Sequence, residues 1–147
     1  MAVAQSRADV VWEGDLVRGQ GWVDYESGVI KKQPITWATR TRRTPGTTSP
    51  EEMIAAAHAG CYAMAFSHTL AQAGALPTRL EVAATCSFDQ VEGKYKITTM
   101  DLDVVGVVPE LDEARFEELA RQAEQACPVS NALRNNVDIR LKARLER

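Results

Sequence analysis

Three cysteines and two histidines are the side chains of this chain best suited to nucleophilic, redox or metal chemistry. Cys61 lies in "SPEEMIAAAHAGCYAMAFSHTLAQAG", residues 49–74, which is apolar almost all round and predicts a central helix. His58 stands three residues before Cys61 and is its neighbour on a helix surface. His68 stands seven residues after it, on nearly the same line along the helix. Cys61 could therefore be structural, a metal ligand or a reactive thiol.

Each of these three interpretations of Cys61 requires different residues elsewhere in the chain. A free cysteine often acts only as a small buried hydrophobe. A metal site is a weak hypothesis, because His68 would lie ~15 Å along the helix axis from His58 and two ligands without a CxxC pair do not indicate zinc. We therefore expect no metal. A reactive thiol needs a group that stabilises the thiolate and a second group that completes the reaction.

Cys127 is a candidate for the second group, the one that completes the reaction of a reactive Cys61. It directly precedes Pro128, which suits the first position of a helix, so Cys127 is predicted to be the helix N-cap. A thiolate there faces unpaired N–H groups and the positive end of the helix dipole. Cysteine is unusual at a position that favours Ser, Thr, Asp or Asn. Cys61 and Cys127 together suit a peroxidatic and resolving pair, whereas Cys86 in "AATCSFD" alternates with strand neighbours and is interpreted as structural.

The first half of the chain predicts a meander followed by the central helix. Residues 9–14, 20–27 and 35–41 alternate with a period of two and are separated by turn residues, which indicates antiparallel strands. The segment "TRRTPGTTSP" is a predicted loop. Ser49 as N-cap, Pro50 at the first helical position and Glu52 completing a capping box mark the helix start. Gly74 is a suitable residue to end it.

The second half predicts a hairpin, two helices and a closing strand. The expected strands are Arg79–Phe88 and Lys94–Val107, joined by the turn "DQVEG". Residues 110–126 form an amphipathic pattern, with one apolar face made by Leu111, Phe116, Leu119, Ala120 and Ala123. The segment "CPVSNALRNN" starts a short helix, and "VDIRLKARL" alternates as a final strand.

These elements indicate an α+β fold in one domain, residues 1–147. Residues 1–48 form the N-terminal β-meander and loop, and residues 49–147 form a helix–hairpin–helix–strand core. Antiparallel sheets are expected to pack around the central apolar helix. Since one sheet covers only one side of that helix, a second subunit is expected to cover another, which predicts a homodimer.

Composition excludes several classes of protein. The net charge is −3 and no run of Lys or Arg occurs, so nucleic acid is not an expected partner. No segment reaches the ~18 consecutive apolar residues of a membrane span. The first residues lack the apolar stretch of a secretory signal, so we expect a cytoplasmic location. In that compartment the three cysteines do not predict a structural disulfide framework.

Two motifs resemble the OsmC/Ohr family of thiol-dependent hydroperoxide reductases, and specifically its OsmC branch. They are "SPEEM…AAHAxC" and "CPVSxxL", whose cysteines are 66 residues apart. The opening "WEGDLVRGQGWVDYESGVIKKQPITWATR" is also similar to the family's N-terminal meander, so the likeness covers nearly the whole chain.

The resemblance implies an OsmC-like fold in an intertwined homodimer with two active sites at the subunit interface. It places the peroxidatic cysteine at Cys61 and the resolving cysteine at Cys127. It places an activating arginine at Arg40, in the strand before the loop, and the glutamate that holds it at Glu51. Arg42 and Arg43 are further arginines close by in the sequence.

The implied reaction reduces organic hydroperoxides to alcohols through a Cys61 sulfenic acid and a Cys61–Cys127 disulfide. An external dithiol, a lipoyl group in the Ohr relatives, restores the thiols, and no bound cofactor is expected. An apolar pocket would favour alkyl or fatty hydroperoxides, and its expected lining is Met53, Ile54, Tyr62, Ala65 and Phe66. We interpret His58 as a packed, hydrogen-bonded residue and His68 as structural.

Two other functions are alternatives. A hydrolase with a Cys–His pair would need a third group that orients the histidine, but no carboxylate lies three or four residues from Cys61. A non-catalytic dimer that binds small molecules is the other.

Overall fold

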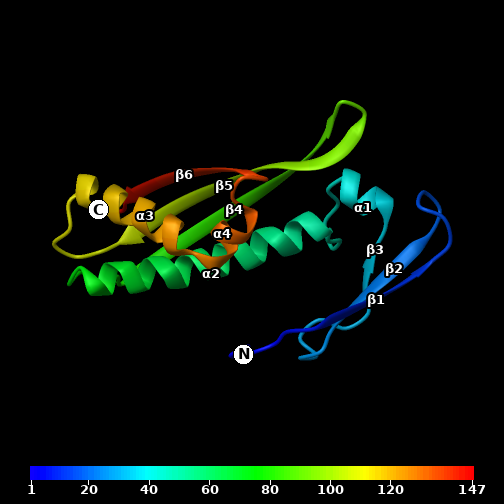
Figure 1. Cartoon of the computed structure of the whole chain (residues 1–147), viewed down its shortest axis with the longest axis horizontal. Coiled ribbons are helices and arrows are strands. Elements are labelled where there is room, and N and C mark those ends of the chain that lie inside the picture. The colour runs from blue at the N-terminus through cyan, green and yellow to red at the C-terminus, as the bar shows by residue number, and fades with distance from the viewer. The chain divides into compact units, whose positions relative to one another are not determined.

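The computed structural model describes the whole chain, residues 1–147. The chain divides into two compact units, Met1–Pro50 and Glu51–Arg147. In Figure 1 the first unit runs from blue to cyan and the second from green to red. No helix combines the length and the hydropathy that a membrane span requires.

The N-terminal unit is a three-stranded antiparallel sheet followed by a short helix. Its strands pair in the order β1 (Ala8–Glu13), β2 (Gln20–Tyr25) and β3 (Gln33–Ile35). The predicted meander is confirmed for its first two strands. The prediction of a third strand over residues 35–41 is wrong, because β3 ends at Ile35 and helix α1 (Trp37–Thr41) follows.

A capping box explains this error. Thr36 is the N-cap of α1, and its hydroxyl oxygen accepts the N–H of Thr39 at 3.1 Å. The Thr39 hydroxyl accepts the N–H of Thr36 in return, at 3.0 Å. Two threonines three residues apart therefore start a helix, although their alternation with apolar residues is also typical of a strand. Arg40 consequently lies on α1 and not on a strand.

Helix α2 (Pro50–Gln72) begins and ends where the sequence predicts. Its C-terminus is a Schellman motif with Gly74 in the left-handed region, at φ 76°. The N–H of Gly74 donates to the carbonyl of Ala71 at 3.0 Å, and that of Ala75 donates to Leu70 at 2.9 Å. These bonds satisfy carbonyls that the helix end leaves free.

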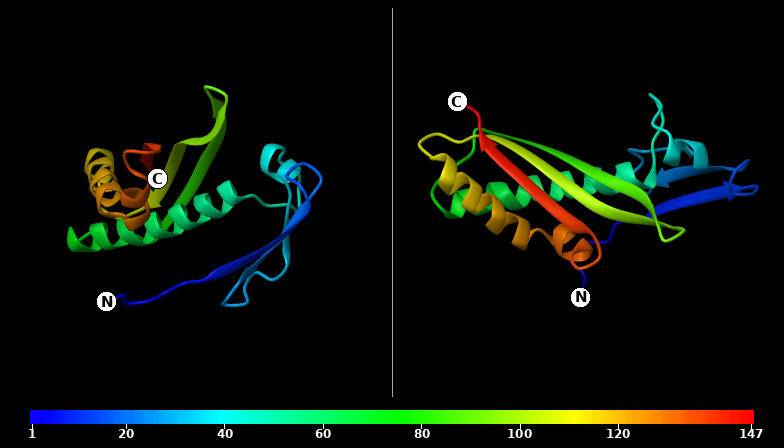
Figure 2. Two further views of the ribbon diagram at one scale, coloured as in Figure 1. Left: turned by 45° about the vertical axis from the view of Figure 1, so that its right-hand side comes forward. Right: turned by 90° about the horizontal axis from the view of Figure 1, so that it is seen from above.

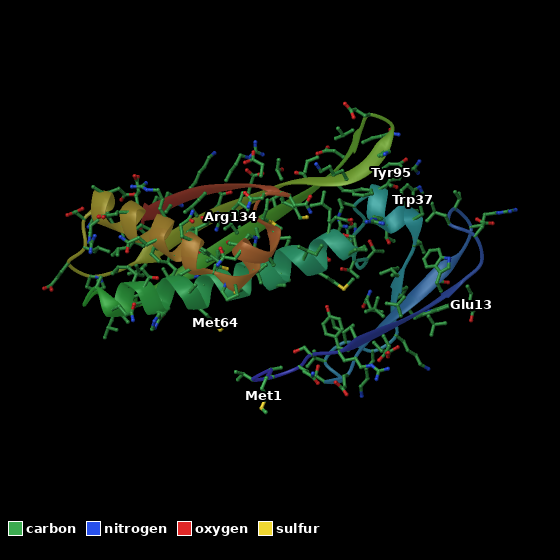
Figure 3. All side chains as sticks on the ribbon, viewed as in Figure 1. Met1, Glu13, Trp37, Met64, Tyr95 and Arg134 are labelled. Carbon is green, nitrogen blue, oxygen red and sulfur yellow. The ribbon has the colours of Figure 1, made fainter.

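One face of α2 is buried and the opposite face is exposed. The buried stripe repeats every four residues: His58, Tyr62, Phe66 and Leu70. The exposed positions on the other side are mostly small or apolar: Ala56, Ala57, Gly60, Met64, His68 and Ala71. In Figure 3 Met64 points away from the sheet of its unit, and it is 71% exposed.

The second unit contains a mixed sheet in the order β4 (Arg79–Val91), β5 (Lys94–Val107) and β6 (Asp138–Leu145). β4 and β5 form the predicted hairpin, but β4 continues past Phe88 to Val91. The turn is therefore only Glu92 and Gly93, both with positive φ, as a two-residue hairpin turn requires.

β6 pairs parallel with β5, which corrects the prediction of antiparallel pairing throughout. Helices α3 (Glu113–Ala126) and α4 (Pro128–Leu133) lie between these two strands in the sequence. A helical connection of this kind returns the chain to the same end of the sheet, so the next strand runs parallel. The predicted amphipathic helix is confirmed as α3, which Asp112 caps by accepting the N–H of Arg115 at 2.8 Å.

The core of this unit lies between one face of the sheet and the two longer helices (Figure 2). Met100, Leu102 and Val104 of β5 are at most 1% exposed and belong to one cluster with α2 and α3. The rings of Phe66 and Phe116 lie 5.0 Å apart between centroids. The helices are thereby fixed against the sheet, with Cys61 on α2 and Cys127 at the junction of α3 and α4.

Candidate active site

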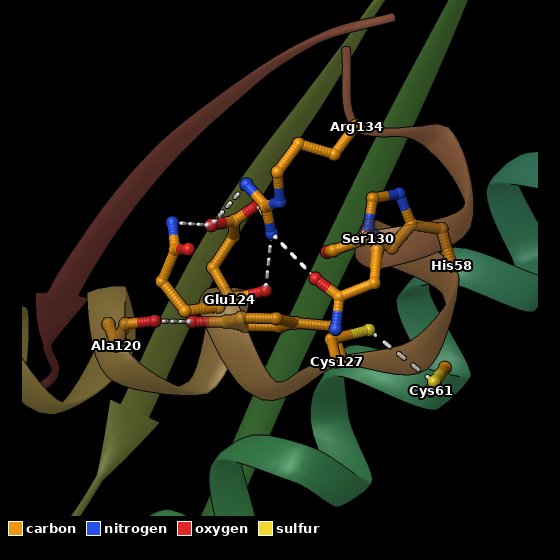
Figure 4. Close-up of polar contacts among 10 residues, drawn as sticks. His58, Cys61, Ala120, Glu124, Cys127, Ser130 and Arg134 are labelled. Carbon is orange, nitrogen blue, oxygen red and sulfur yellow. Dashed lines mark hydrogen bonds and ion pairs between the residues drawn. The ribbon is translucent and has the colours of Figure 1, made fainter. Parts of the chain in front are cut away.

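Cys61 and Cys127 meet where three helices come together. Cys61 lies in the middle of α2, and Cys127 is the single residue between α3 and α4. Their sulfur atoms are 3.4 Å apart, with the Cys127 thiol donating to Cys61 (Figure 4). Both are free thiols. Since an S–S bond is ~2.05 Å long, bridging them needs an approach of only ~1.4 Å.

The two thiols differ in their access to solvent. Cys127 is 0% exposed and belongs to the hydrophobic core. Cys61 is partly buried and packs against that core from its edge. A reagent from outside therefore reaches Cys61 first, and Cys127 stands behind it.

The first turn of the short helix α4 donates a hydrogen bond to Cys61 and none to the Cys127 side chain. Cys127 is the N-cap of α4 with Pro128 at the first position, as predicted, but its side chain makes no capping hydrogen bond. The predicted N-cap position is therefore confirmed, whereas a capping hydrogen bond to its sulfur is not present. The backbone N–H of Val129 instead bonds to Cys61.

The net effect of its surroundings within this unit is to raise the pKa of the Cys61 thiol and so to favour its protonated form. Burial raises the pKa of the Cys61 thiol, and the neighbouring Cys127 raises it further. The N–H of Val129 acts in the opposite direction and lowers the pKa of Cys61. A reactive thiolate at this position consequently needs an additional positive charge close to it.

His58 is a structural tie between α2 and α4. It is 0% exposed, and its Nε2 lies 2.7 Å from the Ser130 hydroxyl oxygen. Burial lowers the pKa of His58. The prediction of a packed, hydrogen-bonded residue is confirmed. Its Nδ1 is buried without a hydrogen-bond partner, so the orienting group that a Cys–His hydrolase requires does not bond to it.

A buried ion pair that the sequence analysis missed lies beside Cys127. Glu124, in the last turn of α3, is 7% exposed and pairs with Arg134 at the end of α4. The signal in the sequence is that Glu124 falls four residues after Ala120, on the otherwise apolar face of α3. An acid on such a face indicates a buried partner.

Glu51 and Arg40 lie in different units of the chain. Glu51 is buried, at 5% exposure, in the first turn of α2. Arg40 belongs to the N-terminal unit, whereas Glu51, Cys61 and Cys127 belong to the second. The roles predicted for Arg40 and Glu51 therefore stay predictions.

The predicted substrate contacts fall into two groups. Met53, Ile54 and Ala65 are partly buried, and the last two pack against the core beside Cys61. Tyr62 and Phe66 have no exposed surface, and the Tyr62 hydroxyl donates to the carbonyl of Ala120 at 2.9 Å. We therefore assign Tyr62 and Phe66 to the core and not to a substrate surface.

The remaining candidates have ordinary surroundings. Cys86 lies on β4 opposite Met100 of β5 and is partly buried, and burial raises its pKa. His68 is exposed on α2. No group of three or more His, Cys, Asp and Glu side chains is placed to hold a metal ion.

Comparison with known proteins connects this arrangement to a family. The chain is 41% identical over 134 residues to peroxiredoxin OsmC of Escherichia coli, covering 90% of this chain and 93% of the relative. It is 34% identical over 95 residues to an organic hydroperoxide resistance protein of Xanthomonas axonopodis, covering 64% and 65%.

A solved structure has the same fold. The organic hydroperoxide resistance protein OhrB of Bacillus subtilis superimposes with a TM-score of 0.77 at 26% identity, over 97% of this chain and 100% of that protein. The sequence pattern of the family described as OsmC-like protein matches residues 43–142, a stretch that contains both paired cysteines. The chain therefore belongs to the OsmC-like protein family.

Proposed function

We propose that this protein is a cysteine-based peroxidase that reduces organic hydroperoxides to alcohols. The observation that carries the proposal is the 3.4 Å distance between the sulfur of the accessible Cys61 and that of the buried Cys127. The relatives named peroxiredoxin and organic hydroperoxide resistance protein support the same reaction. Together they favour a two-cysteine redox cycle over incidental thiols.

The proposed cycle has three steps. The Cys61 thiolate attacks the terminal oxygen of ROOH, the O–O bond breaks, and RO⁻ takes a proton and leaves as alcohol while Cys61 becomes a sulfenic acid. The Cys127 sulfur then bonds to the Cys61 sulfur, and the sulfenic OH leaves with the Cys127 proton as water. An external dithiol reduces the disulfide by thiol–disulfide exchange and is itself oxidised to a disulfide.

Activation of Cys61 is the part of the proposal that involves Arg40. Because burial raises the pKa of Cys61, a guanidinium beside the sulfur would favour the thiolate and donate hydrogen bonds to the peroxide oxygens. The family resemblance assigns that guanidinium to Arg40, with Glu51 holding it in place. Arg42 and Arg43 belong to the same segment of the chain and are the substitutes to test.

The apolar side chains around Cys61 favour an organic substrate. Ile54 and Ala65 lie in the same packed cluster as Cys61, with Met53 next to Ile54 in the chain. Surroundings of this kind gain from burying an alkyl group, which hydrogen peroxide lacks. We therefore propose alkyl or fatty hydroperoxides as substrates.

A second copy of the chain is proposed as a partner in a homodimer. Over residues 56–71 the exposed face of α2 is lined by alanines, Gly60 and Met64, with His68 as its one polar side chain, and carries no Lys, Arg, Asp or Glu. An apolar helix face of this length is typical of a surface that packs against another subunit.

The proposed location is the cytoplasm, where thiol systems keep cysteines reduced.

Turnover by matched cysteine variants tests the function. With cumene hydroperoxide and dihydrolipoamide, we expect Cys61→Ser to lose activity by at least about 10³-fold. Cys127→Ser should complete one turnover and then lose most of its steady-state rate with the dithiol. Cys86→Ser is the control and should keep wild-type activity. Full activity of Cys61→Ser would contradict the proposal.

A further inference from the structure

The position of Cys127 depends on the corner between α3 and α4. Cys127 is at once the C-cap of α3 and the N-cap of α4, with φ −67° and ψ 119°. Its N–H donates to Ala123 at 2.9 Å, and its carbonyl accepts the N–H of Asn131 at 3.0 Å. No further residue separates the helices, so any change in the angle between them moves the Cys127 sulfur.

The side chain of Arg134 spans this corner (Figure 4). Arg134 is the C-cap of α4 and stands seven residues after Cys127. Glu124 stands three residues before Cys127. Arg134 Nη1 donates to Glu124 Oε2 at 3.2 Å, and Nη2 lies 3.0 Å from Oε1. Nη2 also donates to the backbone carbonyl of Glu124 at 3.1 Å.

These contacts join the end of α4 to the end of α3 by both charge and geometry. The Glu124 carbonyl lies in the last turn of α3, where helix carbonyls lack a partner within the helix. The planar guanidinium contacts this carbonyl and both carboxylate oxygens at once, which an ammonium group does not reproduce. Asn131 Oδ1 accepts from the same Nη2 at 3.3 Å and adds a contact from within α4.

The pair is shielded enough to hold the corner firmly. The Glu124 side chain is 9% exposed and that of Arg134 is 29% exposed. Removal of Arg134 leaves the Glu124 carboxylate buried without its counter-ion, with one hydrogen bond from Gln125 Nε2 at 3.0 Å, and an uncompensated buried charge of this kind destabilises the closed corner. Neither residue bonds to the sulfur of Cys61 or Cys127, so the pair acts on the geometry of the thiols and not on the peroxide.

We infer that Arg134, acting through Glu124, is a positioning residue for the resolving step: it holds the α3–α4 corner so that the Cys127 thiol stays within reach of Cys61. This inference rests on the proposed peroxidase cycle. It assigns Arg134 to the second step only, in which the Cys61–Cys127 bond forms and water leaves. The attack of Cys61 on the peroxide does not need it.

Single-turnover kinetics of Arg134→Met separates the two steps. One equivalent of cumene hydroperoxide is mixed with reduced protein, and peroxide loss is followed beside the sulfenic acid trapped by dimedone and the disulfide counted by mass spectrometry. We expect peroxide loss within about 2-fold of wild type. Disulfide formation should slow by about 10- to 100-fold, since a displacement of ~1 Å has effects of that size on intramolecular reactions.

Arg140→Met is the matched control. Arg140 also makes a bidentate ion pair in the same unit, with Asp101 at 2.8 and 2.9 Å, but on the sheet and away from the corner. This variant should form the disulfide at the wild-type rate. Excess peroxide should then over-oxidise Cys61 to sulfinic acid faster in Arg134→Met than in either wild type or Arg140→Met, because the sulfenic acid persists.

The possible failures are distinct. If wild type forms no Cys61–Cys127 disulfide, the peroxidase cycle itself is wrong. If wild type forms it and Arg134→Met forms it equally fast, or if both steps slow equally, or if Arg140→Met is slowed as much, the positioning role is overturned. Should Arg134→Met not fold, Arg134→Lys replaces it, because lysine keeps the positive charge but lacks the planar guanidinium. Arg134→Lys should slow the resolving step alone. A wild-type rate of disulfide formation in Arg134→Lys overturns the inference.

Discussion

The two units of the chain differ sharply in how they bury apolar side chains. In Glu51–Arg147, large residues such as Tyr62, Phe66 and Met100 are 0% exposed and form one cluster. In Met1–Pro50, Val23 is the only buried hydrophobic residue, at 2%. All six residues of β1 are exposed. The second unit therefore has its own core, and the first does not.

This difference indicates what each unit needs in order to be stable. A sheet whose apolar side chains stay in water gains no stabilisation from burying them, and in this unit Val10, Val11 and Trp12 of β1 are all exposed. The N-terminal sheet therefore needs a surface beyond its own residues, and we propose that a second copy of the chain supplies it. The exposed face of α2 also lacks a surface that covers it, although the opposite face of this helix packs in the core of the second unit.

The largest expected effect is on the core of the second unit. Phe116 is 0% exposed and its ring packs against Phe66. Phe116→Ala should lower the free energy of unfolding by about 3–5 kcal/mol, measured by urea denaturation, because it leaves a cavity in a packed core. Val91→Ala, at a residue that is 43% exposed in the β4–β5 hairpin, is the control and should change it by less than about 1 kcal/mol. Equal losses of stability in the two variants would contradict the claim that the second unit is held together by its buried core.

The next effect concerns the uncovered strand β1. Val11 is 58% exposed in the single chain. Wild type should sediment as a species of twice the 16.1 kDa of one chain. Val11→Asp should weaken the assembly by about 10-fold or more, because an apolar interface does not accommodate an unpaired charge. A wild-type monomer, or an unchanged dimer in Val11→Asp, would show that β1 is not covered by a second copy.

The smallest expected effect is on the pH dependence of stability, which we compare between the buried His58 and the exposed His68 of α2. Burial lowers the pKa of His58 below its ordinary 6.5, so the unfolded chain binds a proton more readily than the folded one. The stabilisation is complete above about pH 6.5 and is lost as the pH falls below it, at up to about 1.4 kcal/mol per pH unit. His58→Gln should remove this part of the slope in urea titrations between pH 7 and 5, whereas His68→Gln should retain it.

Local signals in the sequence predicted most elements correctly where one interaction dominates. The helix start at Pro50 and its end near Gly74 follow from residues with a single strong preference. The apolar face of α3 follows from its period. The segment around Thr36 was misread, because threonines alternating with apolar residues suit both a strand and a capping box.

The site was only partly predictable for a related reason. The paired cysteines could be proposed from motifs, and the Cys127 N-cap from Pro128. The donation of the Val129 N–H to Cys61, and the Glu124–Arg134 pair, depend on the angle between α3 and α4 and on the packing of α4 against α2. Glu124 leaves a partial signal as an acid on the apolar face of α3, but its partner and the contact of Val129 with Cys61 depend on packing between helices that no local pattern encodes.

A thiol count after exposure to peroxide tests the central claim most directly. The reduced protein has three thiols, and one equivalent of cumene hydroperoxide is added before titration in denaturant and peptide mapping. The account predicts that one thiol remains, that it is Cys86, and that the new disulfide joins Cys61 to Cys127. Three remaining thiols, or a disulfide that includes Cys86, would contradict it.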